Sequence, residues 1–169
     1  GILSAMTKSA FHSQLEHNPS PATLLEHLNR TIFHLTEEKV FVTFAYLLID
    51  HKTKSVRLAT AGHPPILYRK EKTSNIAQYR TISLGLGIRE KNEFTEEQIK
   101  YDSGDILLLY TDGVIEATGD GGTQFGTEKL EDLLKINDGS AGEICSMITS
   151  ALRRFTKSEV FQDDVTLVC

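Results

Sequence analysis

Residues 104 to 117, GDILLLYTDGVIEA, contain an apolar run that stops abruptly at an aspartate. Ile106 to Tyr110 have no polar face, so this segment is expected to be a β-strand inside a protein core. Thr111, Asp112 and Gly113 follow at once, and the end of a buried strand is a rigid support. The segment therefore predicts an interior strand that carries an acid in a fixed position.

The composition limits the class of protein. A chain of 169 residues with 40% hydrophobic and 24% charged residues is expected to be one globular domain that buries about 70% of its unfolded surface. No apolar run approaches the ~18 residues that span a membrane, so no membrane contact is expected. The net charge of -5 comes from interspersed acids and bases, which argues against nucleic acid as a partner. Only Cys145 and Cys169 are present, which predicts a reducing, cytoplasmic location.

Periodicity predicts helices at both ends of the chain. A first helix should end near His17, and a second should start at Pro21 with Ser20 as its cap. The second helix has an apolar face made of Leu24, Leu25, Leu28, Ile32 and Leu35. Near the C-terminus, Thr127 can cap one helix, and Ser140 with Glu143 forms a capping box for another.

The middle of the chain predicts strands. Residues 40–50 have no polar face and are expected to form an interior strand, paired in a hairpin with residues 55–62. A short strand should follow at 66–70, an exposed polar excursion at 70–80, and an exposed edge strand at 93–101. A last short strand is expected within 163–169. Antiparallel strands with helices packed outside indicate an α+β fold.

Two acidic sites share one design. Asp112 follows a buried strand, and Asp163 and Asp164 precede another. Taken separately, an Asp-Gly pair is most often a turn, and paired acids are most often solvated. Together, the carboxylates of these aspartates could bind Mg²⁺ or Mn²⁺, because these ions prefer oxygen ligands and keep several waters, so that a few aspartates suffice. We therefore predict that Asp112 and Asp163 converge on one metal site.

Haloacid-dehalogenase-type phosphatases also have D-G-V after an apolar strand, but their nucleophilic aspartate lies two residues before that aspartate. Tyr110 occupies this position here. Tyrosine cannot form an acyl-phosphate, so this reaction class is excluded.

Five stretches resemble, in the same order, motifs of the SpoIIE/RsbU type of PPM (PP2C-like) serine/threonine phosphatases. GILSAMTKSA is similar to the helix after a D-x-x-G-H-G motif, ATAGHPPILY to an A-G-H-P-P segment, and ISLGLGI to an L-G turn. YDSGDILLLYTDGVIEA is similar to a G-D-x-L-L-L-Y-T-D-G-V-x-E block, and QDDVTLVC to a closing D-D-x-T-L strand. Each piece is weak by itself, but five in order over essentially the whole chain are specific.

The resemblance implies a PP2C-like sandwich of two antiparallel β-sheets flanked by helices, with two Mn²⁺ or Mg²⁺ ions at one edge. It implies hydrolysis of phosphoserine or phosphothreonine on a bacterial regulatory protein, such as an anti-sigma-factor antagonist of the STAS-domain type, by a water that bridges the ions. Asp112 and Asp163 are the implied metal ligands, with Gly113 and Asp164 immediately behind them. No catalytic residue is expected beyond the ligands.

The start of the chain departs from the family pattern. Gly1 matches the last glycine of G-H-G, so the metal-binding aspartate before that motif is not in the sequence. We expect residues 1–169 to be an N-terminally truncated phosphatase domain from the C-terminal part of a longer protein, and to be inactive alone. Partners or a second copy, as in a homodimer, could cover the exposed sheet edges. The alternative is a non-catalytic phosphatase-like domain that binds a regulatory partner, and a D-x-x-G-H-G motif ending at Gly1 would favour the enzyme.

Overall fold

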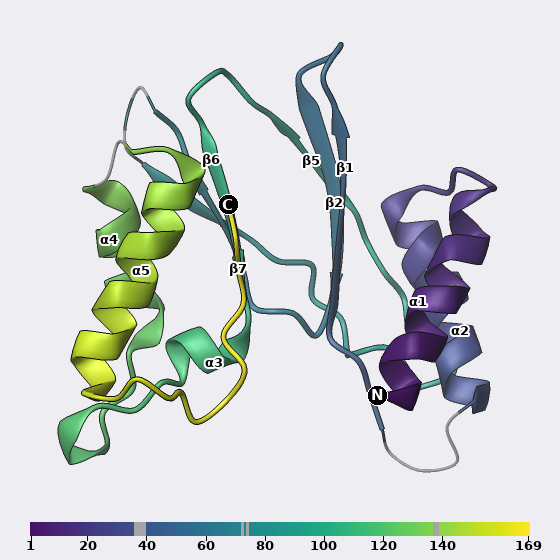
Figure 1. Cartoon of the computed structure of the whole chain (residues 1–169). Coiled ribbons are helices and arrows are strands. Elements are labelled where there is room, and N and C mark those ends of the chain that lie inside the picture. Colours follow the sequence, from purple (N-terminus) through teal and green to yellow (C-terminus); the bar gives the residue numbers. More distant parts are fainter. Residues whose placement is uncertain (36–39, 72, 74, 137–138) are drawn as a thin grey trace. The chain divides into compact units, whose positions relative to one another are not determined.

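A computed structural model describes residues 1–35, 40–71, 73, 75–136 and 139–169. Contacts divide the chain into two units, the first made of Gly1–His63 with Arg80–Tyr101 and the second of Pro64–Tyr79 with Asp102–Cys169 (Figure 1). Each unit combines an antiparallel sheet with helices, so the predicted α+β class with two antiparallel sheets is confirmed. Within the described ranges, no helix combines the length and the hydropathy needed to cross a bilayer.

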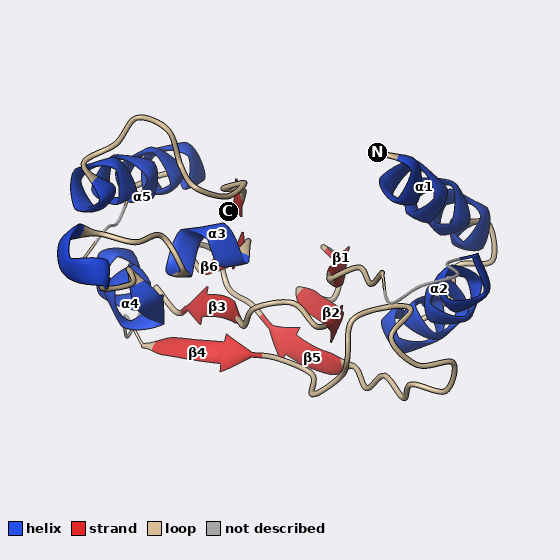
Figure 2. Cartoon of the chain, turned by 90° about the horizontal axis from the view of Figure 1, so that it is seen from below, coloured by secondary structure: helices blue, strands red, loops and turns tan. Residues whose placement is uncertain are grey.

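The first unit contains a three-stranded sheet in the order β1-β2-β5. Its strands are β1 (Phe44–Asp50), β2 (Ser55–Ala61) and β5 (Glu97–Lys100), and both pairings are antiparallel. Helices α1 (Ile2–Leu15) and α2 (Pro21–Leu35) lie side by side (Figure 2). The core consists of apolar residues from α2, β2 and the loop before β5: Leu24, Leu25, Leu28, Ile32, Ala59, Ala61, Leu86 and Phe94.

The predicted helices of this unit are confirmed. Helix α2 begins at Pro21, and the Ser20 hydroxyl accepts a hydrogen bond from the Thr23 N–H at 3.3 Å. Four of the five predicted apolar positions are buried, but Leu35 is 51% exposed. Leu35 is the last residue of the helix and lies beyond the buried stripe.

The prediction of an interior strand at residues 40–50 is wrong. Strand β1 starts only at Phe44, and it lies at an edge of the described sheet, next to β2. Its residues are half-buried or exposed, and Ile49 is 49% exposed. The central strand is β2, because β1 and β5 pair with its two sides. An apolar run does not distinguish an edge strand from a central one.

The second unit contains a four-stranded antiparallel sheet in the order β4-β3-β6-β7. The strands are β3 (Ile66–Arg69), β4 (Ile76–Tyr79), β6 (Ile106–Tyr110) and β7 (Leu167–Val168). Helix α3 (Asp112–Ile115) and the 3-10 turn η1 (Asp120–Gly122) precede α4 (Gly126–Lys135) and α5 (Ala141–Thr156). The core consists of Leu67, Leu108, Tyr110, Val114, Ala117, Phe125, Leu130, Leu134, Ile144, Ile148 and Leu152.

Several predictions for this unit are confirmed. Strand β6 is interior, between β3 and β7. The capping box of α5 is present, since the Ser140 N–H donates to Glu143 Oε2 at 2.7 Å and the Glu143 N–H donates to the Ser140 hydroxyl at 3.4 Å.

Two local predictions for the second unit are wrong. Helix α4 begins at Gly126, with Phe125 rather than Thr127 at the cap position. The segment 70–80, predicted to be an exposed excursion, contains β4, which is an edge strand paired with β3. An edge strand such as β4 is paired on one side only, so it can have a mixed polar sequence. Such a sequence gives no clear strand pattern.

Candidate metal-binding site

Strand β6 ends at Tyr110 in the interior of its sheet. Leu108 pairs with Leu67 of β3, and Tyr110 pairs with Leu167 of β7. Leu108 and Tyr110 are buried, and burial raises the pKa of the Tyr110 hydroxyl. The end of β6 is therefore fixed on both sides, and Tyr110 is a protonated core residue.

Thr111 joins the end of β6 to the segment that leads into β7. Its hydroxyl donates a hydrogen bond to the Asp164 carbonyl oxygen at 2.9 Å and accepts one from the Thr166 N–H at 2.9 Å. Its own N–H donates to the Thr166 carbonyl oxygen at 3.2 Å. Three hydrogen bonds thus hold residues 164–166 against the residue that immediately precedes α3.

Gly113 allows the backbone of the second acidic segment to approach α3. A Cβ atom on Gly113 would lie 2.6 Å from the Asp164 carbonyl oxygen and 3.5 Å from the Asp163 carbonyl carbon. The first distance is shorter than real Cβ contacts, and the neighbouring atom belongs to the backbone. Gly113 is buried by this contact, so at this position the absence of a side chain is a packing requirement.

The fold brings the predicted acidic segments together at one end of the sheet. Asp112 begins α3, while Asp163 and Asp164 lie against Gly113. All three aspartate side chains are exposed. Asp112 Oδ1 accepts a hydrogen bond from the Gly113 N–H at 3.0 Å, and Asp163 Oδ1 accepts one from the Asp164 N–H at 2.8 Å. All three acids are therefore accessible, and the side chains of Asp112 and Asp163 are each partly oriented by the backbone N–H of the next residue.

Carboxylate oxygens in this position suit a hard divalent cation. Mg²⁺ keeps several waters and is commonly held by only one or two protein carboxylates. In the part of the chain that the structure describes, no group of three or more His, Cys, Asp or Glu side chains is placed to hold a metal ion. The aspartates could thus supply some, but not all, of the protein ligands of a metal ion. Their assignment as ligands stays a prediction.

Sequence reasoning did not assign a role to Thr111 or Thr166. In the sequence, Thr111 is only the residue before Asp112, yet its hydroxyl makes two of the hydrogen bonds that connect the acidic segments. The contact depends on the pairing of β6 with β7, and no local pattern signals it.

We expect the Thr111→Val substitution to loosen this end of the sheet, because valine has nearly the same shape but cannot make the two hydrogen bonds. The free energy of unfolding should fall by about 1–2 kcal/mol, as measured by urea denaturation. Thr149→Val is the matched control, since the Thr149 hydroxyl donates to the Cys145 carbonyl of its own helix. An equal loss in the two variants would contradict the connecting role of Thr111.

The family model of stage II sporulation protein E (SpoIIE) matches residues 1–169 of the chain. The chain belongs to the SpoIIE family. Among characterised relatives, phosphoserine phosphatase RsbU from Bacillus subtilis (strain 168) is 27% identical over 167 residues, which is 97% of this chain and 49% of RsbU. The chain thus spans about half the length of this SpoIIE relative.

Solved structures share the fold of this SpoIIE chain. The SiaA-PP2C domain of Pseudomonas aeruginosa has a TM-score of 0.85 at 14% identity, covering 98% of this chain and 67% of that one. The phosphatase domain of the cell fate determinant SpoIIE from Bacillus subtilis, presoaked with Mn, has a TM-score of 0.66 at 20% identity, covering 96% and 70%. The expected PP2C-like fold class is therefore confirmed.

Proposed function

We propose that the protein containing this chain is a metal-dependent phosphatase that acts on phosphoserine and phosphothreonine residues of proteins. The observation that carries the proposal is the close approach of Gly113 to the Asp163–Asp164 backbone, which brings two acidic segments to one end of a sheet. Membership of the SpoIIE family and the similarity to a phosphoserine phosphatase support the same reaction.

Asp112 and Asp163 are the proposed metal ligands. Both carboxylates are exposed, so a cation can reach them without a rearrangement of the core. Thr111 and Gly113 hold the two acidic segments together, and Asp164 takes part through its carbonyl oxygen, which accepts the Thr111 hydrogen bond.

Two Mn²⁺ or Mg²⁺ ions are the proposed cofactor, which agrees with the Mn soak of the solved SpoIIE domain. When bound, such ions supply a water of lowered pKa and neutralise negative charge on the phosphoryl oxygens. The role of the aspartates of this chain would then be to position the ions. Their carboxylates fix where positive charge lies, and in this proposal no side chain of the chain acts as a nucleophile.

The proposed substrate is a phosphorylated bacterial regulatory protein in the cytoplasm, of the STAS-domain anti-sigma-factor antagonist type. The similarity to RsbU supports a phosphoserine substrate. Homodimerisation is a further part of the proposal, and analytical ultracentrifugation of the full-length protein measures it.

The test compares phosphate release from a mixture of phosphoserine peptides by the full-length protein and by residues 1–169 alone. We expect the full-length protein to be active with Mn²⁺, to lose activity in excess EDTA and to regain it when Mn²⁺ is restored. Residues 1–169 alone should be at least about 100-fold slower, because Asp112 and Asp163 are too few anionic ligands for two ions.

Two other outcomes would change this conclusion. Equal rates for the two proteins would show that ligands outside residues 1–169 are unnecessary. Phosphopeptide binding without hydrolysis by the full-length protein at any concentration of Mn²⁺ or Mg²⁺ would favour the alternative of a non-catalytic binding domain.

A further inference from the structure

A cavity of 180 Å³ opens beside the acidic segments of the second unit. One side is formed by α3 and the residues after it, and the other by the last residue of α5 and the loop that leads to β7. Its lining includes Glu116, Thr118, Thr156, Ser158, Val160 and Asp163, and we call this cavity the α3 pocket. Gly113 also lines it, so the α3 pocket directly adjoins the candidate metal site.

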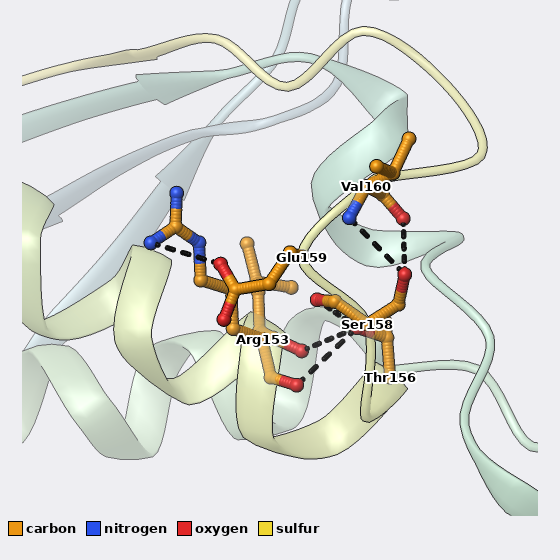
Figure 3. A network of polar contacts seen from close by, with 6 residues as sticks. Arg153, Thr156, Ser158, Glu159 and Val160 are labelled. Atoms are coloured by element: carbon orange, nitrogen blue, oxygen red, sulfur yellow. Dashed lines mark hydrogen bonds and ion pairs between the residues drawn. The ribbon is translucent and has the colours of Figure 1, made fainter.

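Hydrogen bonds within the loop that follows α5 hold one wall of the α3 pocket in place (Figure 3). The Ser158 hydroxyl donates to the Val160 carbonyl oxygen at 2.7 Å and accepts from the Val160 N–H at 3.1 Å. On the outside of this loop, Arg153 and Glu159 form an ion pair at 3.4 Å. These contacts connect residues within the loop itself and connect the wall to the end of α5.

Oxygen acceptors surround the α3 pocket. The hydroxyls of Thr118, Thr156 and Ser158 each donate their proton to a backbone carbonyl. The oxygens of Thr118 and Thr156 can therefore accept hydrogen bonds from a ligand, and that of Ser158, which already accepts one from the Val160 N–H, can accept one more. Such a lining suits a ligand that donates hydrogen bonds.

Glu116 gives the α3 pocket a negative charge. It is exposed, and among the residues that the structure describes its carboxylate makes no hydrogen bond or ion pair. Asp163 also lines the pocket, but in the proposed function a metal ion neutralises its charge. A volume of 180 Å³ gives room for one side chain.

The position of Glu116 relates the α3 pocket to the site of the phosphate. The Glu116 N–H donates to the Asp112 carbonyl oxygen at 2.9 Å, so Glu116 lies just over one helical turn after Asp112, or about 6 Å along the helix axis. An extended peptide advances about 3.3–3.6 Å per residue. A residue one to three positions from a phosphoserine bound at the proposed metal site beside Asp112 can therefore reach the pocket.

We propose that the α3 pocket receives a lysine or arginine side chain that lies close to the phosphorylated residue of the substrate. Glu116 forms the ion pair with this cation, and the hydroxyls of the pocket accept its remaining hydrogen bonds. The inference rests on the proposed function, because only a phosphate bound at the proposed metal site of Asp112 and Asp163 brings neighbouring substrate residues to the pocket.

The experiment uses the full-length protein with Mn²⁺ and pairs of phosphoserine peptides. The two peptides of a pair differ at one position only, which is lysine in one and glutamate in the other. Each of the three positions on either side of the phosphoserine is tested in turn. We expect kcat/KM to be about fivefold higher for the lysine peptide at one or more positions. Glu116→Gln should bring this ratio close to one, and Glu116→Lys should reverse it. Glu128→Gln is the matched control, since Glu128 is exposed on the first turn of α4, and it should leave the ratio unchanged.

Peptides that carry a phosphonate analogue of phosphoserine separate this inference from the proposed function, because their affinity can be measured by fluorescence anisotropy without turnover. Hydrolysis with equal kcat/KM for lysine and glutamate peptides, or a lysine preference that survives Glu116→Lys, overturns the inference alone. Absence of hydrolysis overturns the proposed function. If hydrolysis is absent, the α3 pocket is still supported when the lysine phosphonate peptide binds more tightly than the glutamate peptide and Glu116→Gln removes the difference. Equal affinities of the two peptides overturn the role of the α3 pocket as well.

Discussion

The Asp112→Asn substitution in the full-length protein is expected to lower Mn²⁺-dependent phosphatase activity by at least about 100-fold. Asparagine keeps the shape of the side chain, and its amide oxygen can still accept the hydrogen bond from the Gly113 N–H. The substitution removes the negative charge that holds the cation. Phosphate release measured over a series of Mn²⁺ concentrations should show the loss, with partial recovery at high Mn²⁺.

The same substitution should leave the fold intact, because the Asp112 side chain is exposed. We expect the free energy of unfolding to change by less than about 0.5 kcal/mol. Asp132→Asn is the matched control, since Asp132 lies on α4 and pairs with Lys135 at 3.0 Å, and it should retain full activity. Full activity of Asp112→Asn would make Asp112 an ordinary turn residue and would remove the main support for the phosphatase proposal.

The Gly113→Ala substitution is expected to reduce stability and activity together. The added Cβ atom would meet the Asp164 carbonyl oxygen at 2.6 Å, and the hydrogen bonds of Thr111 prevent this backbone from moving away freely. Overpacking of this kind should lower the free energy of unfolding by about 1–3 kcal/mol. Because Asp163 is displaced with the backbone, Mn²⁺-dependent activity should fall by about tenfold or more.

Gly142→Ala is the matched control for this substitution. Gly142 lies in α5, and a Cβ atom there would meet nothing within 4 Å. Alanine is favoured over glycine in a helix, so this variant should be as stable as the wild type or up to about 1 kcal/mol more stable. If Gly113→Ala behaved in the same way in urea denaturation, the close approach of the two acidic segments would be refuted.

Local patterns in the sequence were sufficient for the presence of α1, α2, α4 and α5 and for the interior strand β6, although not for α3 or for the cap of α4. The capping box of Ser140 with Glu143 and the apolar positions of α5 are set by residues three or four apart, so a short window of sequence contains the information. The same holds for Ile106–Tyr110, where a run with no polar face predicted burial in the sheet.

The position of a strand within its sheet could not be predicted in this way. Residues 40–50 are as apolar as an interior strand, yet β1 lies at an edge, and the polar segment 70–80 contains β4. Strand order depends on pairing between residues far apart in the sequence, and a single-strand pattern contains no information about the partner.

The sequence by itself determined the fold class, the four longer helices and the aspartates to test, because each rests on local periodicity or on a motif. Only the tertiary structure decided how the acidic segments meet. The hydrogen bonds of Thr111 with residues 164–166, the contact of Gly113 with the Asp164 carbonyl and the α3 pocket beside Glu116 all join residues that are far apart in the sequence and that no local pattern connects. These contacts follow from the register of β6 with β7 and from the path of the loop after α5, and both form only when the whole unit folds.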